Sequence, residues 1–192
     1  MSRVDEFNLT AELQAFAFEE FGETIDSRTK GLFDLRQLIA NLPEKDRIID
    51  ISDKNLLRFL RARKYDLDAT LKSVIQYHHF MSSHESILSN IQRNEITDFS
   101  DFLTVVREPG PRGKLIVIMR PALGIPLFTI ELLKANPRVM FRYNFWLFER
   151  ISHDPYAQIC GLILINSFKG LGFWGQMKMS SMAPISDQFA TF

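Results

Sequence analysis

The stretch Leu56–Phe80, LLRFLRARKYDLDATLKSVIQYHHF, decides how the N-terminal half of this sequence folds. Its apolar residues recur every three or four positions, which is the spacing of amphipathic helices. Two helices are predicted here, because Ser52 before the stretch and Asp66 within it are residue types that cap helix N-termini. The first covers DKNLLRFLRARKY and the second covers LDATLKSVIQYHHFMS.

Two earlier segments are also expected to be helical. Thr10 is a candidate N-cap for a helix that runs through FEEF. GLFDLRQLIANLP gathers its leucines and Ile39 on one side and ends at Pro43, which cannot continue a helix. The first hundred residues therefore read as an all-helical domain.

The pattern changes after about Ser100. KLIVIMR (Lys114–Arg120) and ICGLILIN (Ile159–Asn166) are apolar without alternation, as strands buried on both faces are. Between them, a short helix is expected from Thr129 and a longer one from Asn136-Pro137, and SHDPY is read as a loop. Strand, crossover helices and strand predict a β-α-β unit with two parallel strands.

The predicted fold class is α/β, with a helical domain at residues 10–100 followed by a partial α/β domain at residues 101–192. A last helix is expected near Pro184, and the sequence stops soon after it. Two parallel strands with one crossover are a poor independent unit. We therefore expect the chain to be truncated relative to its complete fold, or to be completed by something else.

The composition bounds the functional class. The 192 residues include 17 Phe, and the formal net charge is zero, so nothing draws the whole chain to nucleic acid. Cys160 is the only cysteine, so no intrachain disulfide is possible. The polar N-terminus lacks a secretory signal, and no apolar run reaches the ~18 residues of a membrane span. A cytoplasmic protein able to touch a membrane surface is expected.

The segment KGLGFWG (Lys169–Gly175) contains G-x-G-x-x-G, the dinucleotide-binding pattern. That pattern needs a helix directly after its third glycine and an acid about 20 residues later. Here GQMKMSSMAP does not favour such a helix, and the only acid that follows is Asp187. We read the segment as a loop after a strand, which leaves a dinucleotide enzyme as the least favoured function.

No other pattern predicts an enzyme, a metal site or a bound cofactor. The sequence lacks H-E-x-x-H, G-x-S-x-G and the phosphate-binding G-x-x-x-x-G-K pattern. Cys160 lies in an apolar strand pattern, where a buried, inert thiol is expected. The histidines are read as packing residues rather than metal ligands, and they are His78, His79, His84 and His153.

A basic helix is the first candidate binding feature. Lys54, Arg58 and Arg61 share one predicted face of this helix. The opposite face carries Leu56, Phe59 and Leu60. Arg63 falls near the apolar face and is expected to point toward a neighbouring element or a buried carboxylate. Two interpretations stay open: a solvated face with one structural ion pair, or a surface that binds an anionic lipid head group.

An aromatic helix is the second candidate feature. MFRYNFWLF (Met140–Phe148) is apolar nearly all round. It is either a core helix covered on both sides, which composition favours, or a helix with one side on the sheet and the other side lining a lipid cavity.

Together these stretches resemble the CRAL-TRIO family. LLRFLRAR, an aromatic residue and D-x-D-x-A resemble its N-terminal helical signature, and KLIVIMR, FTIELL and GLILINSFKGLG are similar to the first half of its lipid-binding domain. The resemblance runs from about residue 10 to the end. Within the family it is greatest to the branch of alpha-tocopherol transfer protein and cellular retinaldehyde-binding protein.

The resemblance implies a hydrophobic pocket for one lipid and contact with phosphoinositides through basic residues. In the tocopherol branch, a basic residue at the position of Arg63 contributes to that contact, and we extend the site along the helix. Ile118, Phe141 and Leu162 match pocket-lining positions, and we add their neighbours on the same strand faces or helix side. The expected lipid-pocket residues are Ile116, Ile118, Phe141, Phe145, Leu162 and Leu164, and the expected phosphoinositide contacts are Lys54, Arg58, Arg61 and Arg63.

The sequence also departs from the family pattern. After the second strand, the family has D-L-x-G or D-x-E-G, where this chain has SFKG, so any ion pair that uses those acids is lost. Asn136-Pro137 interrupts a helix that is usually continuous. The family also continues for many tens of residues beyond Phe192.

The resemblance implies a non-enzymatic lipid carrier. The expected function is to bind, and to transfer between membranes, a small tocopherol-, retinoid- or phospholipid-like lipid. The expected partners are this lipid and an anionic, phosphoinositide-containing membrane, with transient membrane association from the cytoplasm and no nucleic acid. The alternative is an interaction or regulatory module that uses a CRAL-TRIO scaffold without transferring lipid.

Overall fold

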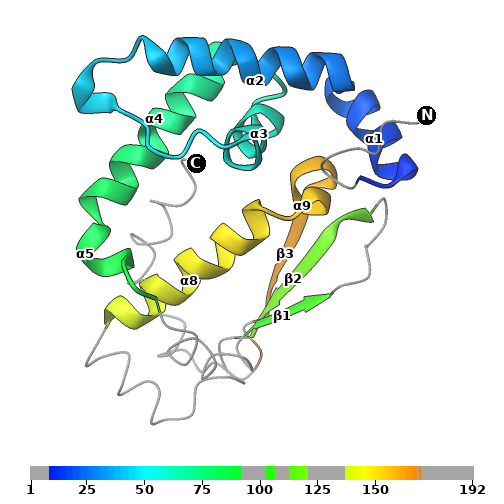
Figure 1. Cartoon of the computed structure of the whole chain (residues 1–192). Helices are drawn as coiled ribbons and strands as arrows, with labels where there is room; N and C mark the ends of the chain where they lie inside the picture. The colour runs from blue at the N-terminus through cyan, green and yellow to red at the C-terminus, as the bar shows by residue number, and fades with distance from the viewer. Residues whose placement is uncertain (1–8, 92–102, 107–112, 121–136, 168, 170–192) are drawn as a thin grey trace. The chain divides into compact units, whose positions relative to one another are not determined.

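The computed structural model of the protein describes residues 9–91, 103–106, 113–120, 137–167 and 169. The chain divides into two compact units (Figure 1). One unit contains the residues up to Ser82 together with Ile151–Gly161, and the other contains Ser83–Arg150 with the residues from Leu162 onward. The predicted domain boundary at residue 100 lies outside the described residues and stays a prediction.

The first unit is helical, as predicted from its apolar spacing. A core of buried apolar side chains joins three of its helices, and Leu35, Leu56 and Leu60 have no exposed surface. Gly31 allows a close approach in this core, because a Cβ there would lie 3.0 Å from the Tyr65 ring. The helices of the unit are α1 (Ala11–Phe21), α2 (Ile25–Ala40), the 3-10 helix η1 (Glu44–Asp46), α3 (Asp53–Ala62), α4 (Leu67–Ser83) and α9 (Pro155–Cys160).

The predicted helix starts are confirmed by their caps. The Thr10 hydroxyl accepts a hydrogen bond from Leu13 N at 3.2 Å, and the Ser52 hydroxyl accepts one from Asn55 N at 3.4 Å. The Asp66 carboxylate accepts one from Ala69 N at 2.9 Å, directly before α4 begins. These side chains satisfy backbone N–H groups that have no partner inside the helix.

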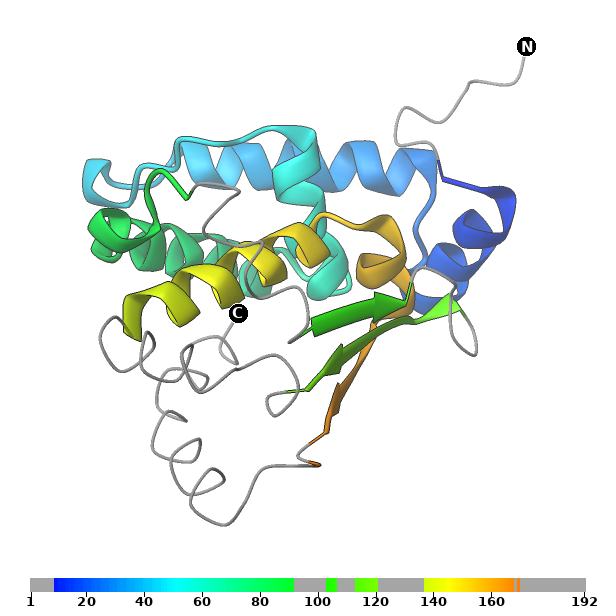
Figure 2. The ribbon, with the colours of Figure 1, turned by 90° about the horizontal axis from the view of Figure 1, so that it is seen from below.

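The second unit contains a three-stranded sheet with the order β1-β2-β3 (Figure 2). The strands are β1 (Leu103–Val106), β2 (Leu115–Met119) and β3 (Leu162–Asn166). β2 and β3 are parallel, with Ile118 opposite Ile165, which confirms the predicted β-α-β unit. β1 pairs antiparallel with β2 and was not predicted. The chain also forms the helices α5 (Glu85–Leu88) and α8 (Pro137–Ser152). The helical N-terminal part and the later sheet together make an α/β fold, as predicted.

The region before β3 differs from the prediction. The expected strand ICGLILIN is divided, because residues 155–160 form α9 and the strand begins only at Leu162. Asp154 caps α9 by accepting hydrogen bonds from Tyr156 N and Ala157 N, so part of the expected SHDPY loop is a helix start. Gly161 ends the helix with a φ of 77°, a conformation that glycine adopts without strain. Cys160 is therefore helical, although it is buried as expected.

Other predicted elements lie outside the described residues. These are the short helix from Thr129, the helix near Pro184 and the glycine motif of KGLGFWG after Lys169. The predicted start of the long crossover helix is confirmed, because α8 begins at Pro137.

Candidate functional site

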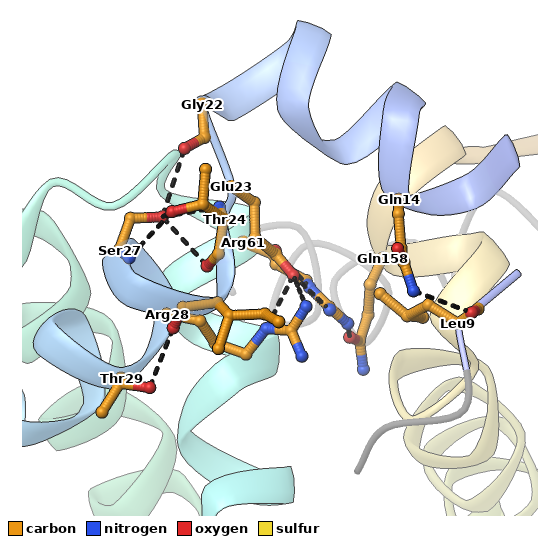
Figure 3. Close-up of polar contacts among 11 residues, drawn as sticks. Leu9, Gln14, Gly22, Glu23, Thr24, Ser27, Arg28, Thr29, Arg61 and Gln158 are labelled. Atoms are coloured by element: carbon orange, nitrogen blue, oxygen red, sulfur yellow. Dashed lines mark hydrogen bonds and ion pairs between the residues drawn. The ribbon is translucent and has the colours of Figure 1, made fainter. Parts of the chain in front are cut away.

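The side chains of helix α3 form a buried polar network within the helical unit (Figure 3). Glu23 lies between α1 and α2, and its side chain is 1% exposed. Arg61 of α3 donates to both oxygens of the Glu23 carboxylate, from Nη2 to Oε1 at 2.7 Å and from Nε to Oε2 at 2.8 Å. Arg28 of α2 donates to the same carboxylate from Nε at 3.0 Å. Three segments are thus joined at one carboxylate.

The charges of this network set the ionisation of its members. Burial alone would raise the pKa of the Glu23 carboxyl, but the hydrogen bond from Arg61 and the charges of Arg61 and Arg28 outweigh it, so the pKa is lowered. Burial and the nearby Glu23 carboxylate raise the pKa of Tyr65. Glu23 is therefore an anion, and Tyr65 a neutral phenol, at physiological pH. The opposite charges offset the desolvation of the three ionised groups.

The network continues to the last residue of α8, Ser152, and to Gln158 of α9. Arg61 Nη1 donates to Gln158 Oε1 at 2.6 Å, and Gln158 Nε2 donates to the Ser152 carbonyl at 2.8 Å. Arg58 Nη1 donates to the Ser152 hydroxyl at 2.7 Å. The Arg58 guanidinium also lies over the Phe59 and Tyr77 rings, 4.7 and 4.6 Å from their centroids.

Of the two interpretations of the basic face left open by the sequence, a solvated face does not hold for Arg58 and Arg61. Arg58 and Arg61 are buried, because the face that they share with Lys54 covers Glu23 and the residue 151–161 segment. Lys54, in the first turn of α3, is exposed. Arg63 is half-buried and donates from Nε to the Ser73 hydroxyl at 2.8 Å. Arg61, rather than Arg63, is the arginine that pairs with a buried carboxylate.

The sheet separates the predicted lipid-pocket residues. Side chains opposite each other in register lie on the same face of a sheet, and neighbours along a strand lie on opposite faces. Ile116 and Ile118 are opposite Ile163 and Ile165, so these four isoleucines share one face. Leu162 and Leu164 share the other face with their register partners Leu115 and Val117.

Both faces of the sheet are therefore apolar. The two pocket residues predicted on each strand do share a face. Ile116 and Ile118, however, lie on the opposite side of the sheet from Leu162 and Leu164. A single pocket on one face cannot be lined by all four of these side chains. On β3, Leu162, Leu164 and Ile165 keep substantial exposed surface, between 38% and 44%.

Helix α8 is buried along two of its sides. Phe141 and Phe145 are four residues apart and lie on one side, whereas Tyr143 and Leu147 lie on the opposite side; all four are buried. Burial raises the pKa of Tyr143 to about 12. The His84 ring stacks on Phe141 with the centroids 5.5 Å apart. Burial on both sides agrees with the prediction from composition that α8 is a core helix.

Polar contacts fix this helix within its unit. Arg142 of α8 donates from Nη1 to the carbonyls of Ile87 and Ser89 and from Nη2 to that of Asn90, at the C-terminal end of α5. A cation at this position complements the partial negative charge of a helix C-terminus. Among the described residues of this unit, Arg120 Nε and Asn144 Oδ1 are buried polar atoms with no hydrogen-bond partner.

The described part of the chain contains no cluster of three or more His, Cys, Asp or Glu side chains placed to hold a metal ion. Cys160 is buried, and burial, together with the charges of Glu12 and Asp154, raises the pKa of its thiol. A thiol with a raised pKa is a weak nucleophile. Within the same described segments, no helix is long and apolar enough to cross a membrane.

Comparison with known proteins agrees with this structure. Residues 17–75 match the family described as "CRAL/TRIO, N-terminal domain". Proteins named "Alpha-tocopherol transfer protein-like" from Homo sapiens, Pongo abelii and Mus musculus are 30% identical to this chain over 167 residues. The aligned region covers 85% of this chain and 46% of each relative, so the chain spans about half of their length.

These matches show which proteins the chain is similar to. Its N-terminal helices match the CRAL/TRIO N-terminal domain, and the predicted resemblance to CRAL-TRIO proteins of the tocopherol transfer branch is confirmed. The matched range 17–75 contains Glu23, Arg28, Arg58 and Arg61, whereas the partners of these arginines in the segment 151–161 lie outside it.

Sequence reasoning missed two of the residues that organise the site. Glu23 lies between two helices, where no periodic pattern marks a buried carboxylate, and its partner Arg61 is 38 positions away. Gln158 lies between the expected SHDPY loop and the strand expected from Ile159, where no functional residue was predicted. The only local signal was that Glu23 directly follows Gly22, the glycine that ends α1 with a φ of 65°.

Proposed function

We propose that this chain binds a small hydrophobic lipid, tocopherol-, retinoid- or phospholipid-like, and takes part in moving it between membranes. The proposal is supported by the CRAL/TRIO N-terminal domain and by relatives whose names describe tocopherol transfer proteins. The mechanism has no covalent step. Removal of apolar ligand surface from water contributes about 25 cal/mol per Å² of buried area.

The observation that carries this proposal is the apolar character of both sheet faces, with leucine side chains of β3 partly exposed. A parallel strand usually has both faces covered by other elements. Leu162 and Leu164, at 38% and 41% exposed, leave apolar surface that a lipid would cover. We propose Leu162 and Leu164 for the pocket together with Phe141 and Phe145, and we assign Ile116 and Ile118 to the other face.

Native mass spectrometry of the protein purified from cells tests the proposal directly. A lipid mass that leaves the protein on activation, and is then identified, would support carrier function and name the class of lipid. Protein that carries no lipid, and takes none up from vesicles containing tocopherol, retinol or phosphatidylinositol, would contradict it. A bound nucleotide would instead support the dinucleotide alternative.

For contact with phosphoinositides, we propose Lys54 and Arg63 as the contacting residues among the four predicted from sequence. Lys54 is exposed, and Arg63 keeps part of its surface accessible. Arg58 and Arg61 are engaged in the buried network, so their role in our proposal is to hold α3 in place. Transient association of a cytoplasmic protein with an anionic membrane is the expected setting.

Vesicle sedimentation with and without phosphatidylinositol bisphosphate tests this contact. The double variant Lys54→Ala/Arg63→Ala should bind such vesicles several-fold more weakly, with a smaller salt dependence, because two head-group contacts are lost. The variant Lys72→Ala, another exposed cation on α4, is the matched control. Equal binding of the double variant and the wild type would remove Lys54 and Arg63 from the proposal.

A second candidate function is that of a protein-interaction module without lipid transfer. It is favoured by exposed apolar residues on the helical unit, since Ile49 is 83% and Phe33 is 59% exposed. Exposed apolar residues mark an association site where they gather in one contiguous patch. A protein partner whose binding is lost in Phe33→Ser/Ile49→Ser, together with the absence of any lipid ligand, would favour this candidate over the carrier.

A further inference from the structure

Arg120, directly after β2, has a guanidinium group that the sheet engages only in part. Its Nη2 atom donates a hydrogen bond to the hydroxyl of Thr104 on β1. Its Nε atom is shielded from solvent and has no acceptor among the residues that the structure describes. A shielded donor of a charged group is costly without a partner, so such atoms are rare in folded proteins. The guanidinium therefore has a donor left for an acceptor from outside the described chain.

The strand register places Ser167 next to Arg120 on one face of the sheet. Ile118 lies opposite Ile165, and Arg120 and Ser167 each follow two residues later. Because side chains two positions apart lie on the same face, both residues continue the face of the isoleucines. The pairing does extend this far, since Ser167 N donates to the Met119 carbonyl at 2.8 Å. An arginine and a hydroxyl are thus neighbours at one corner of the sheet.

This corner has positive charge that the strands do not neutralise. Lys169 is exposed and follows Ser167 by two residues, which span at most ~7 Å of chain. The other lysine of these segments, Lys114, lies at the opposite end of β2. Asp and Glu are absent from the described residues of the three strands and their ends, which are 103–106, 113–120, 162–167 and 169.

The location is typical of ligand sites. Open α/β sheets bind ligands outside the carboxyl ends of their parallel strands. Arg120 and Ser167 follow the carboxyl ends of the parallel strands β2 and β3. Guanidinium, hydroxyl and ammonium groups all donate hydrogen bonds to oxyanions. Two positive charges without a carboxylate match a doubly charged phosphate better than a singly charged carboxylate.

We propose that Arg120, Ser167 and Lys169 form a binding site for the phosphate group of a small soluble molecule. Arg120 Nε and the Ser167 hydroxyl donate to phosphate oxygens, and Lys169 supplies the second positive charge. The site continues the isoleucine face of the sheet, opposite the leucine face that we propose for the lipid. Phosphate binding is therefore independent of lipid binding.

Titration calorimetry of the purified full chain with inorganic phosphate tests the proposal. At constant ionic strength, the wild type should bind a single phosphate. Lys169→Gln should bind it about two- to fivefold more weakly, as expected for the loss of one exposed charge contact. The matched control Lys114→Gln should keep the wild-type affinity. Equal weakening in the two variants would overturn the site, because the attraction would then reflect net charge alone.

A second variant, Ser167→Asp, supplies Arg120 with a carboxylate from the chain itself. It should bind phosphate at least tenfold more weakly, because the new carboxylate occupies the guanidinium and repels the anion. Without phosphate, its Tm should exceed that of the wild type by about 2–4 °C, since the shielded Nε gains an acceptor. Unchanged phosphate affinity, or a lower Tm, would contradict the proposal.

A comparison with vesicles separates a soluble phosphate from a membrane head group. Lys54→Ala/Arg63→Ala should keep the wild-type affinity for inorganic phosphate, because those residues lie on the helical unit. The soluble ligand would be overturned if inorganic phosphate did not bind and vesicles with phosphatidylinositol phosphate bound only without the Ser167→Asp change. Absence of binding in both assays would overturn the site and leave the proposed lipid binding untouched.

Discussion

Glu23 and Arg61 are each buried because the other is present. Moving a carboxylate or a guanidinium out of water is costly, and a partner of opposite charge with short hydrogen bonds offsets that cost. The Glu23 carboxylate accepts from two arginines, and its side chain is almost completely shielded. If one arginine were lost, the carboxylate would stay buried, but only one positive charge would remain to offset the cost of removing it from water.

We expect Arg61→Ala to lower the free energy of unfolding by about 3–5 kcal/mol, the usual cost of breaking a buried ion pair. Chemical denaturation measures this change. Lys54→Ala, on the same helix but exposed, should change it by less than about 0.5 kcal/mol. If both variants lost similar amounts of unfolding free energy, the buried network would contribute no more to stability than an exposed side chain does.

The network also predicts how stability depends on pH. The folded protein lowers the pKa of Glu23 below its ordinary value of 4.5, so its ionised form adds stability above that pH. The contribution is lost as the pH falls below 4.5 and through the lowered folded value. The stability difference between wild type and Glu23→Gln, measured by chemical denaturation, should therefore shrink below pH 4.5. A difference that stays constant down to low pH would contradict this.

At the scale of elements, the sequence was informative wherever structure is local. Thr10, Ser52 and Asp66 were recognisable as caps because capping depends on a side chain and the backbone three residues further on. The parallel strands were recognisable from their unbroken apolar runs. β1 escaped prediction because four residues, LTVV, carry little periodic signal, and α9 because its apolar residues merge with those of β3.

The site was less predictable than the elements, because it depends on which faces meet. Helical spacing correctly grouped Lys54, Arg58 and Arg61, but spacing does not say whether a basic face meets solvent or a carboxylate such as Glu23. Likewise, alternation along β2 and β3 was predictable, but the register that places Ile118 opposite Ile165 depends on pairing between strands.

Disulfide trapping tests the register of the sheet. In a Cys160→Ala background, the pair Ile118→Cys/Ile165→Cys should oxidise readily, because register partners on one face are close enough for a disulfide. The pair Ile118→Cys/Leu164→Cys should stay reduced, since its side chains point to opposite faces. Non-reducing gels or mass spectrometry distinguish the two. Efficient oxidation of the second pair alone would indicate a register shifted by one residue.

At the scale of the whole molecule, a distant segment completes the helical unit. Helices α9 and α1 lie side by side (Figure 1). Ile159 and Cys160 pack with Leu9, Leu13 and Ala17 in one buried cluster. Gln158 and Ser152 hold the same segment to α3 through its two arginines. The helical unit is therefore assembled from two parts of the chain.

We expect the backbone amides of α1 and α9 to lose their protection from hydrogen exchange together when the cluster that they share is weakened. Leu13→Ala should destabilise their shared cluster by about 2–5 kcal/mol, as large-to-small changes in a core do. Hydrogen exchange should then rise in α9 as well as in α1, far apart as they are in the sequence. Lys72→Ala, an exposed change in the same unit, should raise neither. Faster exchange in α1 alone would show that α9 does not share its cooperative unit.

The split origin of the helical unit has a consequence for synthesis of the protein on the ribosome. α1 and α3 are made early, but the segment that covers them, Ile151–Gly161, emerges only after residues 83–150. At the usual rates of translation this delay is on the order of several seconds. During that interval the apolar side of α1 and the two arginines of α3 lack their last partners, so the nascent chain presents a chaperone with a defined and temporary binding surface.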